Sequence, residues 1–162
     1  MTSPSDSREI RPVRAADAPR LAGLLAQLGY PSDAGAVTRR LATILDSAAQ
    51  QVFVAADGAR IDGYVGVERR PALLHQDEHA EITGLVVDAA ARRAGLGRTL
   101  VRAAEQWAAR QGLPAIVVRS NVVRPASHPF YEGLGYLRTS TSHSYFKDLT
   151  AGGGRRRWAA GP

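Results

Sequence analysis

Residues Glu81–Ala109 read EITGLVVDAAARRAGLGRTLVRAAEQWAA and contain the pattern that decides the fold. The apolar, β-branched residues up to Val87 predict a strand. Apolar residues then recur at helical spacing, which predicts a long helix from about Gly95 to Gln111. Between the two lies Arg92-x-x-Gly95-x-Gly97. A helix start leaves backbone N–H groups unpaired and carries partial positive charge, and glycines let an anion approach those amides. This turn therefore predicts either a phosphate-binding loop or simply a tight loop that glycine eases.

Two familiar nucleotide motifs do not fit the turn. It has no Gly-Lys-Ser/Thr, as a nucleotide P-loop requires. A dinucleotide fingerprint needs three glycines, and the next glycine, Gly112, lies too far along the chain. The turn is therefore not assigned to either class.

The periodicity on both sides of this stretch predicts a mixed β-sheet with helices on both faces, in the order βααβββαβαββ. Asp17 and Ser32 are the expected N-caps of the first two helices. Gly84 interrupts its strand, which indicates a β-bulge or a packing position beneath a helix. The expected strands are Glu9–Arg14, Gln51–Ala56, Arg60–Glu68, Ala80–Val87, Ile116–Arg119, Tyr136–Thr139 and His143–Lys147, and the remaining helices are Asp17–Leu28, Ser32–Ala48 and Ser127–Gly133.

Length and composition favour one domain. Of the 162 residues, 44% are hydrophobic and 22% charged, and we expect a single domain over residues 8–149 between a disordered leader (1–7) and a flexible Gly/Arg-rich tail (150–162). The apolar runs reach only about five residues, against the roughly 20 needed to span a bilayer. The first residues, MTSPSDSREI, have no apolar core typical of a signal peptide. We therefore expect a soluble cytoplasmic protein with no membrane partner.

Charge and residue types exclude several other functions. The absence of cysteine rules out disulfides, thiolate metal sites and cysteine nucleophiles. The histidines show no ligand spacing, so we expect no metal. Of the net charge of +6, three charges come from Arg155–Arg157 in the tail, where only Trp158 accompanies them. Nucleic-acid binding needs basic residues interleaved with aromatics on one face, so the sequence argues against such a partner.

Two motifs together resemble the GCN5-related N-acetyltransferase (GNAT) family. Arg92, Gly95 and Gly97 match its Arg/Gln-x-x-Gly-x-Gly/Ala signature after the fourth strand. Asn121 and then FYEGLGY, residues 130–136, match its second signature after the fifth strand. The interval between Asn121 and Tyr131 is longer than in many members. The resemblance extends from Glu9 to about Lys147.

The resemblance implies acetyl-CoA as co-substrate, without a metal. In such proteins the fourth strand bulges away from the fifth, and its free backbone groups pair with the pantetheine arm. The implied coenzyme site comprises Leu85, Val86, Val87, Arg92, Arg93, Ala94, Gly95, Leu96, Gly97, Arg98, Asn121 and Tyr131.

The resemblance also suggests two proton-transfer residues. Glu81 has the interval to Arg92 at which the histone-acetylating branch carries its general base, although it could be a surface carboxylate, with His79 as a substitute base. Tyr131 matches the tyrosine that protonates the leaving thiolate, or it packs the last helix against the sheet. Residues expected to border the acceptor cleft are Tyr30, Glu68 and the run His75–His79.

The function predicted from these residues is acetyl transfer from acetyl-CoA to a primary amine of a small molecule or peptide, directly within a ternary complex. A non-catalytic acyl-CoA-binding sensor or regulatory module is the alternative. The sequence leaves both a monomer and a homodimer open.

Overall fold

The structure is a computed structural model that describes residues 8–73, 77–92, 95–120 and 126–149. The chain divides into two compact units, Met1–Arg119 and Ser120–Pro162.

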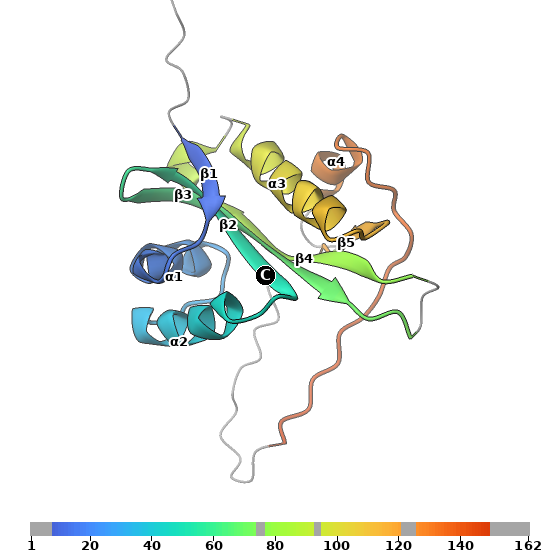
Figure 1. Ribbon diagram of the computed structural model, residues 1–162, viewed down its shortest axis with the longest axis horizontal. Coiled ribbons are helices and arrows are strands. Elements are labelled where there is room, and N and C mark those ends of the chain that lie inside the picture. The colour runs from blue at the N-terminus through green and yellow to red at the C-terminus, as the bar shows by residue number, and fades with distance from the viewer. Residues whose placement is uncertain (1–7, 74–76, 93–94, 121–125, 150–162) are drawn as a thin grey trace, which may run out of the picture. The chain divides into compact units, whose positions relative to one another are not determined.

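A five-stranded mixed sheet forms the centre of the first unit (Figure 1). The spatial order of the strands follows the chain, β1-β2-β3-β4-β5, and neighbours are antiparallel except β4 and β5, which are parallel. The strands are β1 (Glu9–Pro12), β2 (Gln50–Asp57), β3 (Arg60–Arg70), β4 (His79–Val87) and β5 (Ile116–Val118). The mixed sheet expected from the sequence is therefore confirmed.

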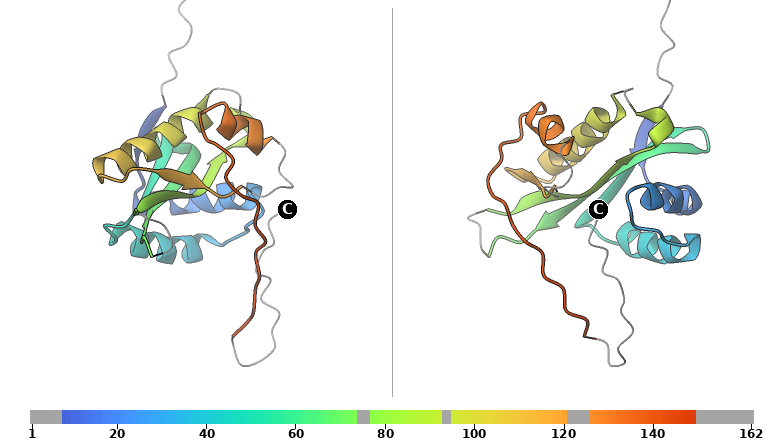
Figure 2. Two further views of the ribbon diagram at one scale, coloured as in Figure 1. Left: turned by 90° about the vertical axis from the view of Figure 1, so that its right-hand side faces the viewer. Right: turned by 180° about the vertical axis from the view of Figure 1, so that it is seen from behind.

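Helices cover both faces of this sheet (Figures 1 and 2). Helices α1 (Ala18–Gln27) and α2 (Ala34–Leu45) lie on one face, and α3 (Leu96–Arg110) lies on the other. Two short 3-10 turns precede α1 and α3: η1 (Ala15–Asp17) and η2 (Ala89–Ala91). Helices on both faces are thus confirmed as well.

Apolar stripes at helical spacing explain this arrangement. On the α1/α2 side, leucines of both helices pack on buried residues of β2 and β3, including Leu24, Leu41, Val54 and Ile61. On the opposite side Leu100 of α3 is fully buried. It packs so closely on Gly63 of β3 that a Cβ atom on Gly63 would lie 3.1 Å from its Cδ1 atom. Burying each such leucine contributes about 1.5–3 kcal/mol, so these stripes hold the three layers together.

Of the two expected N-caps, Asp17 does stand at the N-cap position of α1 but makes no capping hydrogen bond, and Ser32 is not the cap of α2. The carboxylate of Asp17 caps no group of α1; it accepts from Arg14 N at 2.8 Å and pairs with Arg11, because η1 starts before the helix. At α2 the cap is Asp33, whose Oδ1 accepts from Ala36 N at 2.8 Å, and not Ser32. An aspartate caps as well as a serine does, and Asp33 has the extended backbone that a cap needs.

The second unit contains one short helix, α4 (Ser127–Glu132), within its described residues. Residues 136–149 form no strand, so the two expected strands Tyr136–Thr139 and His143–Lys147 are wrong. Leu137 and Tyr145 are exposed. Alternation of apolar residues gives a strand only when a partner strand accepts its hydrogen bonds, and no pairing involves this segment.

No helix in the described ranges has both the length and the apolar character needed to cross a membrane.

Candidate active site

A β-bulge deforms β4 at the position where the sequence places a glycine. Val67 pairs with Ile82, but Gly66 pairs with Gly84, so Thr83 is an extra residue in β4. A Cβ on Gly66 would lie 2.5 Å from Thr83 Oγ1, and one on Gly84 would lie 3.1 Å from the Tyr64 hydroxyl. The bulge indicated by Gly84 is confirmed; a side chain at Gly66 would collide with Thr83, and one at Gly84 would crowd the Tyr64 hydroxyl.

Beyond this bulge β4 has no neighbour on its second edge among the described strands. Its parallel pairing with β5 covers only Ala80–Ile82, opposite Ile116–Val118. The rest of β4 pairs with β3 alone. Backbone N–H and C=O groups on the free edge therefore need another partner. Leu85, Val86 and Val87 lie on this stretch, where the backbone can pair with an extended ligand.

The chain between β4 and α3 is held by α1. Asp88 Oδ1 accepts from Ala90 N at 2.9 Å, and its other oxygen pairs with Arg20. Gln27 Oε1 accepts from Ala89 N at 3.0 Å. The Ala90 N–H, followed by Arg20, holds the pKa of Asp88 below its usual range. This ionised carboxylate ties the turn after β4 to a helix on the α1/α2 face.

The start of α3 has the geometry that the glycine motif indicates. Gly95 is the N-cap residue and has φ +74°, a left-handed conformation that favours glycine. Gly97 lies in the first turn of α3, and Arg98 is exposed. Leu96 is buried in the core, so only its backbone is available to a ligand. The first N–H groups of this helix are available to an anion.

Among the other predicted coenzyme residues, Arg92 lies in the turn before α3. Arg92 is exposed, and its Nε donates to Val87 O at 3.4 Å. Arg93 and Ala94 lie outside the described residues, as does Asn121.

Glu81 is buried and holds two guanidinium groups. Only 8% of its side chain is exposed, and Oε2 accepts from Arg70 Nε at 3.0 Å while Oε1 accepts from Arg119 Nε at 3.1 Å. Arg70 Nε also lies 3.0 Å from Glu68 Oε1. Because each carboxylate oxygen has two lone pairs, both oxygens of Glu81 can still accept another proton donor.

Alternation along β3 and β4 places a polar strip on the α1/α2 face of the sheet. Tyr64, Glu68 and Arg70 are separated by even intervals on β3, and Glu81 pairs with Glu68 while His79 pairs with Arg70. Tyr64 also packs against the core of that face. Burial raises the pKa of Tyr64 to about 12, with a smaller contribution from Tyr30. The Tyr64 phenol therefore stays protonated at neutral pH.

Sequence reasoning missed Tyr64 and Arg70 of this strip, and also Arg119, the second partner of Glu81. Tyr64 and Arg70 stand at even intervals from Glu68, so strand alternation could have indicated them. Arg119 follows β5, far along the chain, and no local signal ties it to Glu81. The predicted substitute base, His79, is buried on the same strip. Tyr30 is exposed, and His75 and Gln76 lie outside the described residues.

The second unit carries Tyr131 on α4. Its ring makes edge contacts with Phe130 at 5.0 Å and with Tyr136 at 5.6 Å between centroids, and its side chain is half-buried. His128 lies on the same helix. The described parts of the chain contain no group of His, Cys, Asp or Glu arranged to hold a metal ion.

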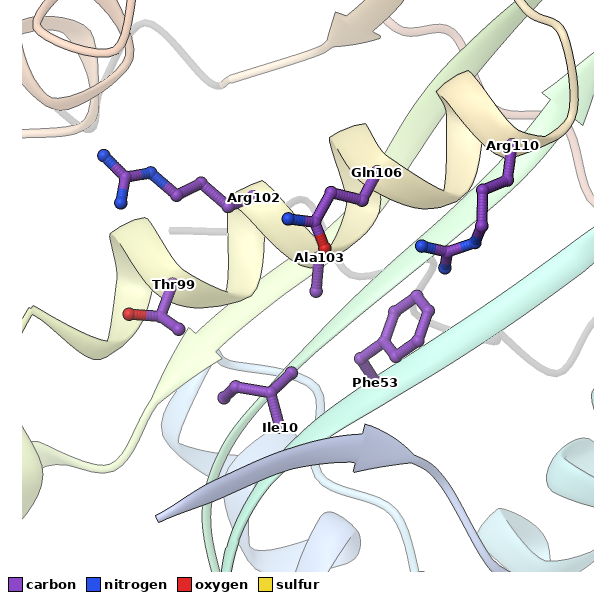
Figure 3. Close-up of a pocket in the computed structure, with 7 residues that line it drawn as sticks. All are labelled: Ile10, Phe53, Thr99, Arg102, Ala103, Gln106 and Arg110. Carbon is purple, nitrogen blue, oxygen red and sulfur yellow. The ribbon is translucent and has the colours of Figure 1, made fainter. Parts of the chain in front are cut away.

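A separate pocket of about 360 Å³ lies between α3 and the β1/β2 part of the sheet (Figure 3). It is on the α3 face, opposite the polar strip, and holds none of the predicted site residues. Its lining consists of Ile10, Phe53, Thr99, Arg102, Ala103, Gln106 and Arg110.

Comparison with known proteins gives one family match and several relatives. The profile of the acetyltransferase (GNAT) family matches residues 24–136. A curated relative, N-acetyltransferase family 8 member 3 of Mus musculus, is 29% identical over 73% of this chain and 51% of its own length. The chain thus spans about half the length of this relative.

Solved structures match the fold over most of both chains. A transcriptional regulator from Bacillus halodurans C-125 has a TM-score of 0.80 and 25% identity, covering 86% of this chain and 99% of that one. The structure of AAC(6')-Iy, an aminoglycoside N-acetyltransferase, in complex with the bisubstrate analogue CoA-S-monomethyl-acetylneamine has a TM-score of 0.77 at 20% identity, covering 87% and 98%. The second likeness concerns the fold alone.

Proposed function

This chain belongs to the acetyltransferase (GNAT) family, and on that premise we propose that it transfers an acetyl group from acetyl-CoA to a primary amine. The transfer is direct, within a ternary complex. The observation that carries the proposal is the course of β4: a buried carboxylate, Glu81, then a bulge, then a free strand edge that leads to the Gly95 helix start. Strand β4 thus supplies a base and a backbone partner for an extended ligand, and the start of α3 that follows it supplies an anion site.

The residues present fit the coenzyme. The backbone groups of Leu85 and Val87, which face the free edge of β4, would hold the pantetheine arm, with Val86 between them hydrogen-bonded to β3; the N–H groups at the start of α3 would hold the pyrophosphate. Arg92 and Arg98 add positive charge at this loop. Arg93, Ala94 and Asn121 stay predictions for the same site. In support, AAC(6')-Iy, a fold relative, binds CoA in its crystal structure. When bound, acetyl-CoA supplies the activated acetyl group.

The chain's own residues would carry the proton transfers. An amine of pKa about 10 is protonated at neutral pH and is not a nucleophile until a base takes its proton. Glu81, with a free lone pair on each oxygen, takes this proton directly or through water. Backbone N–H groups of β4 stabilise the charge that develops on the thioester oxygen. Tyr131 donates its phenolic proton to the departing thiolate.

A non-catalytic acyl-CoA sensor is the second candidate. The fold relative from Bacillus halodurans is described as a transcriptional regulator, which favours this reading. The buried carboxylate of Glu81 favours catalysis, since a sensor needs no carboxylate on the strand that leads to the coenzyme loop. The extent of one domain over residues 8–149, the cytoplasmic location and the choice between monomer and homodimer stay predictions.

The deciding experiment measures thiol release from acetyl-CoA with a panel of primary amines. Thiol release that depends on the amine, with the acetylated product identified by mass spectrometry, supports the enzyme. Acetyl-CoA binding by calorimetry without turnover on any amine would favour the sensor. Failure to bind acetyl-CoA would refute both.

A further inference from the structure

Two exposed arginines, Arg70 and Arg119, flank the buried Glu81, and they indicate which chemical group the acceptor carries beside its amine. The side chain of Arg119 is 67% exposed and that of Arg70 is 48% exposed. Each uses its Nε atom to bind Glu81. Within the described residues, the structure gives the terminal nitrogens of these two groups no hydrogen-bond partner. Glu81 thus fixes two guanidinium groups whose outward donors are free.

We propose that the amine acceptor carries a carboxylate next to its amino group, and that Arg119, supported by Arg70, binds this carboxylate. The inference rests on the proposed function and names its substrate class: free amino acids and their close analogues. A guanidinium presents its donors in a planar fork that matches a carboxylate, and such charge-assisted pairs are stronger than neutral hydrogen bonds.

The distribution of charge favours Arg119 as the principal contact. Arg70 is shared by two carboxylates, Glu68 and Glu81, so its charge is already compensated. Arg119 has Glu81 as its only ion-pair partner among the described residues. When Glu81 accepts the proton of the amine it becomes neutral, and Arg119 is left with no counter-ion. A carboxylate on the acceptor compensates this charge at the moment of transfer.

The geometry also limits how far the carboxylate can lie from the amine. The donor that holds Glu81 and the donors that face outward belong to the same planar group of Arg119. An amine near Glu81 and a carboxylate at the outer edge of Arg119 therefore lie on opposite sides of one guanidinium. An α-amino acid spans this distance when a water molecule relays the amine proton to Glu81, whereas a peptide N-terminus or a lysine side chain of a protein carries no carboxylate there.

The test compares matched triplets of acceptors: an amino acid, its amide and the amine formed by its decarboxylation. Alanine and phenylalanine triplets cover a small and a large side chain. Rates are expressed per concentration of neutral amine, because the three members differ in amine pKa. We expect kcat/KM for the amino acid to exceed that of both partners at least tenfold. A hydrogen bond to a charged group contributes about 1.5–3 kcal/mol, equivalent to roughly 10- to 150-fold.

Arg119→Gln should remove this preference: kcat/KM for the amino acid should fall at least tenfold further than kcat/KM for the amide and the amine, which lose only the effect of one missing partner of Glu81. Arg119→Lys, which keeps the charge but not the fork, should retain part of it. Arg60→Gln is the matched control: Arg60 is 56% exposed and ion-paired to Asp57 and Asp62 at the far end of β3. It should leave the preference unchanged.

Three outcomes would overturn the inference. Equal kcat/KM within each triplet would show that the acceptor needs no carboxylate. An equal loss on all three acceptors in a folded Arg119→Gln variant would make Arg119 a positioning residue for Glu81. Acetyl-CoA binding without turnover on any amine would refute the proposed function itself, and the inference would fall with it.

Discussion

Replacing Glu81 with glutamine should separate catalysis from stability. The two side chains have the same shape, but an amide has one accepting oxygen where the carboxylate has two. One of the two guanidinium contacts, at 3.0 Å and 3.1 Å, is therefore lost together with the charge. Both arginines are substantially exposed, and Arg70 keeps Glu68, so water takes over the lost contact. After allowance for this screening we expect a stability cost of about 1 kcal/mol or less.

The effect on turnover should be much larger. General base catalysis contributes roughly 10²- to 10⁴-fold, so kcat/KM for the amine should fall by that factor and the rising limb of its pH profile should disappear. The assay is thiol release from acetyl-CoA over a pH series, with urea denaturation measured on the same sample. Asp57→Asn is the control, since it also removes a carboxylate from an arginine pair on the same sheet. Full activity with an unshifted pH profile would make Glu81 structural and leave His79 or water as the base.

Three further predictions concern other parts of the chain. Tyr131→Phe should lower kcat about 10²-fold with unchanged coenzyme affinity, and a wild-type rate would rule out Tyr131 as the acid. Gly97→Asp should abolish acetyl-CoA binding in calorimetry without lowering Tm, because a negative charge in the first turn of α3 suits the helix but repels a pyrophosphate; unchanged affinity would contradict the coenzyme site. Asp17→Ala should cost about 3–5 kcal/mol in urea denaturation at pH 7, since it leaves the buried guanidinium of Arg11 uncompensated. Arg11 holds the pKa of Asp17 below its usual 3.8, so this contribution is present above that pH and is lost as the pH falls through the folded-state pKa. A difference between wild type and variant that stays constant down to the acid limit would refute the assignment.

Local patterns in the sequence were sufficient for most elements of the sheet and for the long helix. Helix α3 was expected from Gly95 to Gln111 and runs over Leu96–Arg110, because apolar spacing and a terminal glycine are both short-range signals. The hairpin of β2 and β3 and the bulge at Gly84 were readable for the same reason. The residues that start and end these elements influence the backbone only within a few positions along the chain.

Features that need a distant partner were decided only by the tertiary structure. The segment from Tyr136 to Lys147 alternates like two strands, yet forms none, since a strand needs another edge to pair with. Whether Ser32 or Asp33 caps α2 depends on where its first turn begins. Both the absent strands and the choice of cap depend on backbone positions that no local pattern determines.

The candidate site likewise combines a residue that the sequence indicates with partners that only the fold brings to it. The sequence by itself determined that a carboxylate, Glu81, stands on the strand before the glycine turn, because that interval is fixed along one continuous segment. Only the folded sheet brings Arg70 from β3 and Arg119 from the end of β5 to opposite oxygens of that carboxylate. The physical reason is that hydrogen-bonded strand pairing, which sets β3 and β5 on either side of β4, joins segments that are far apart in the chain.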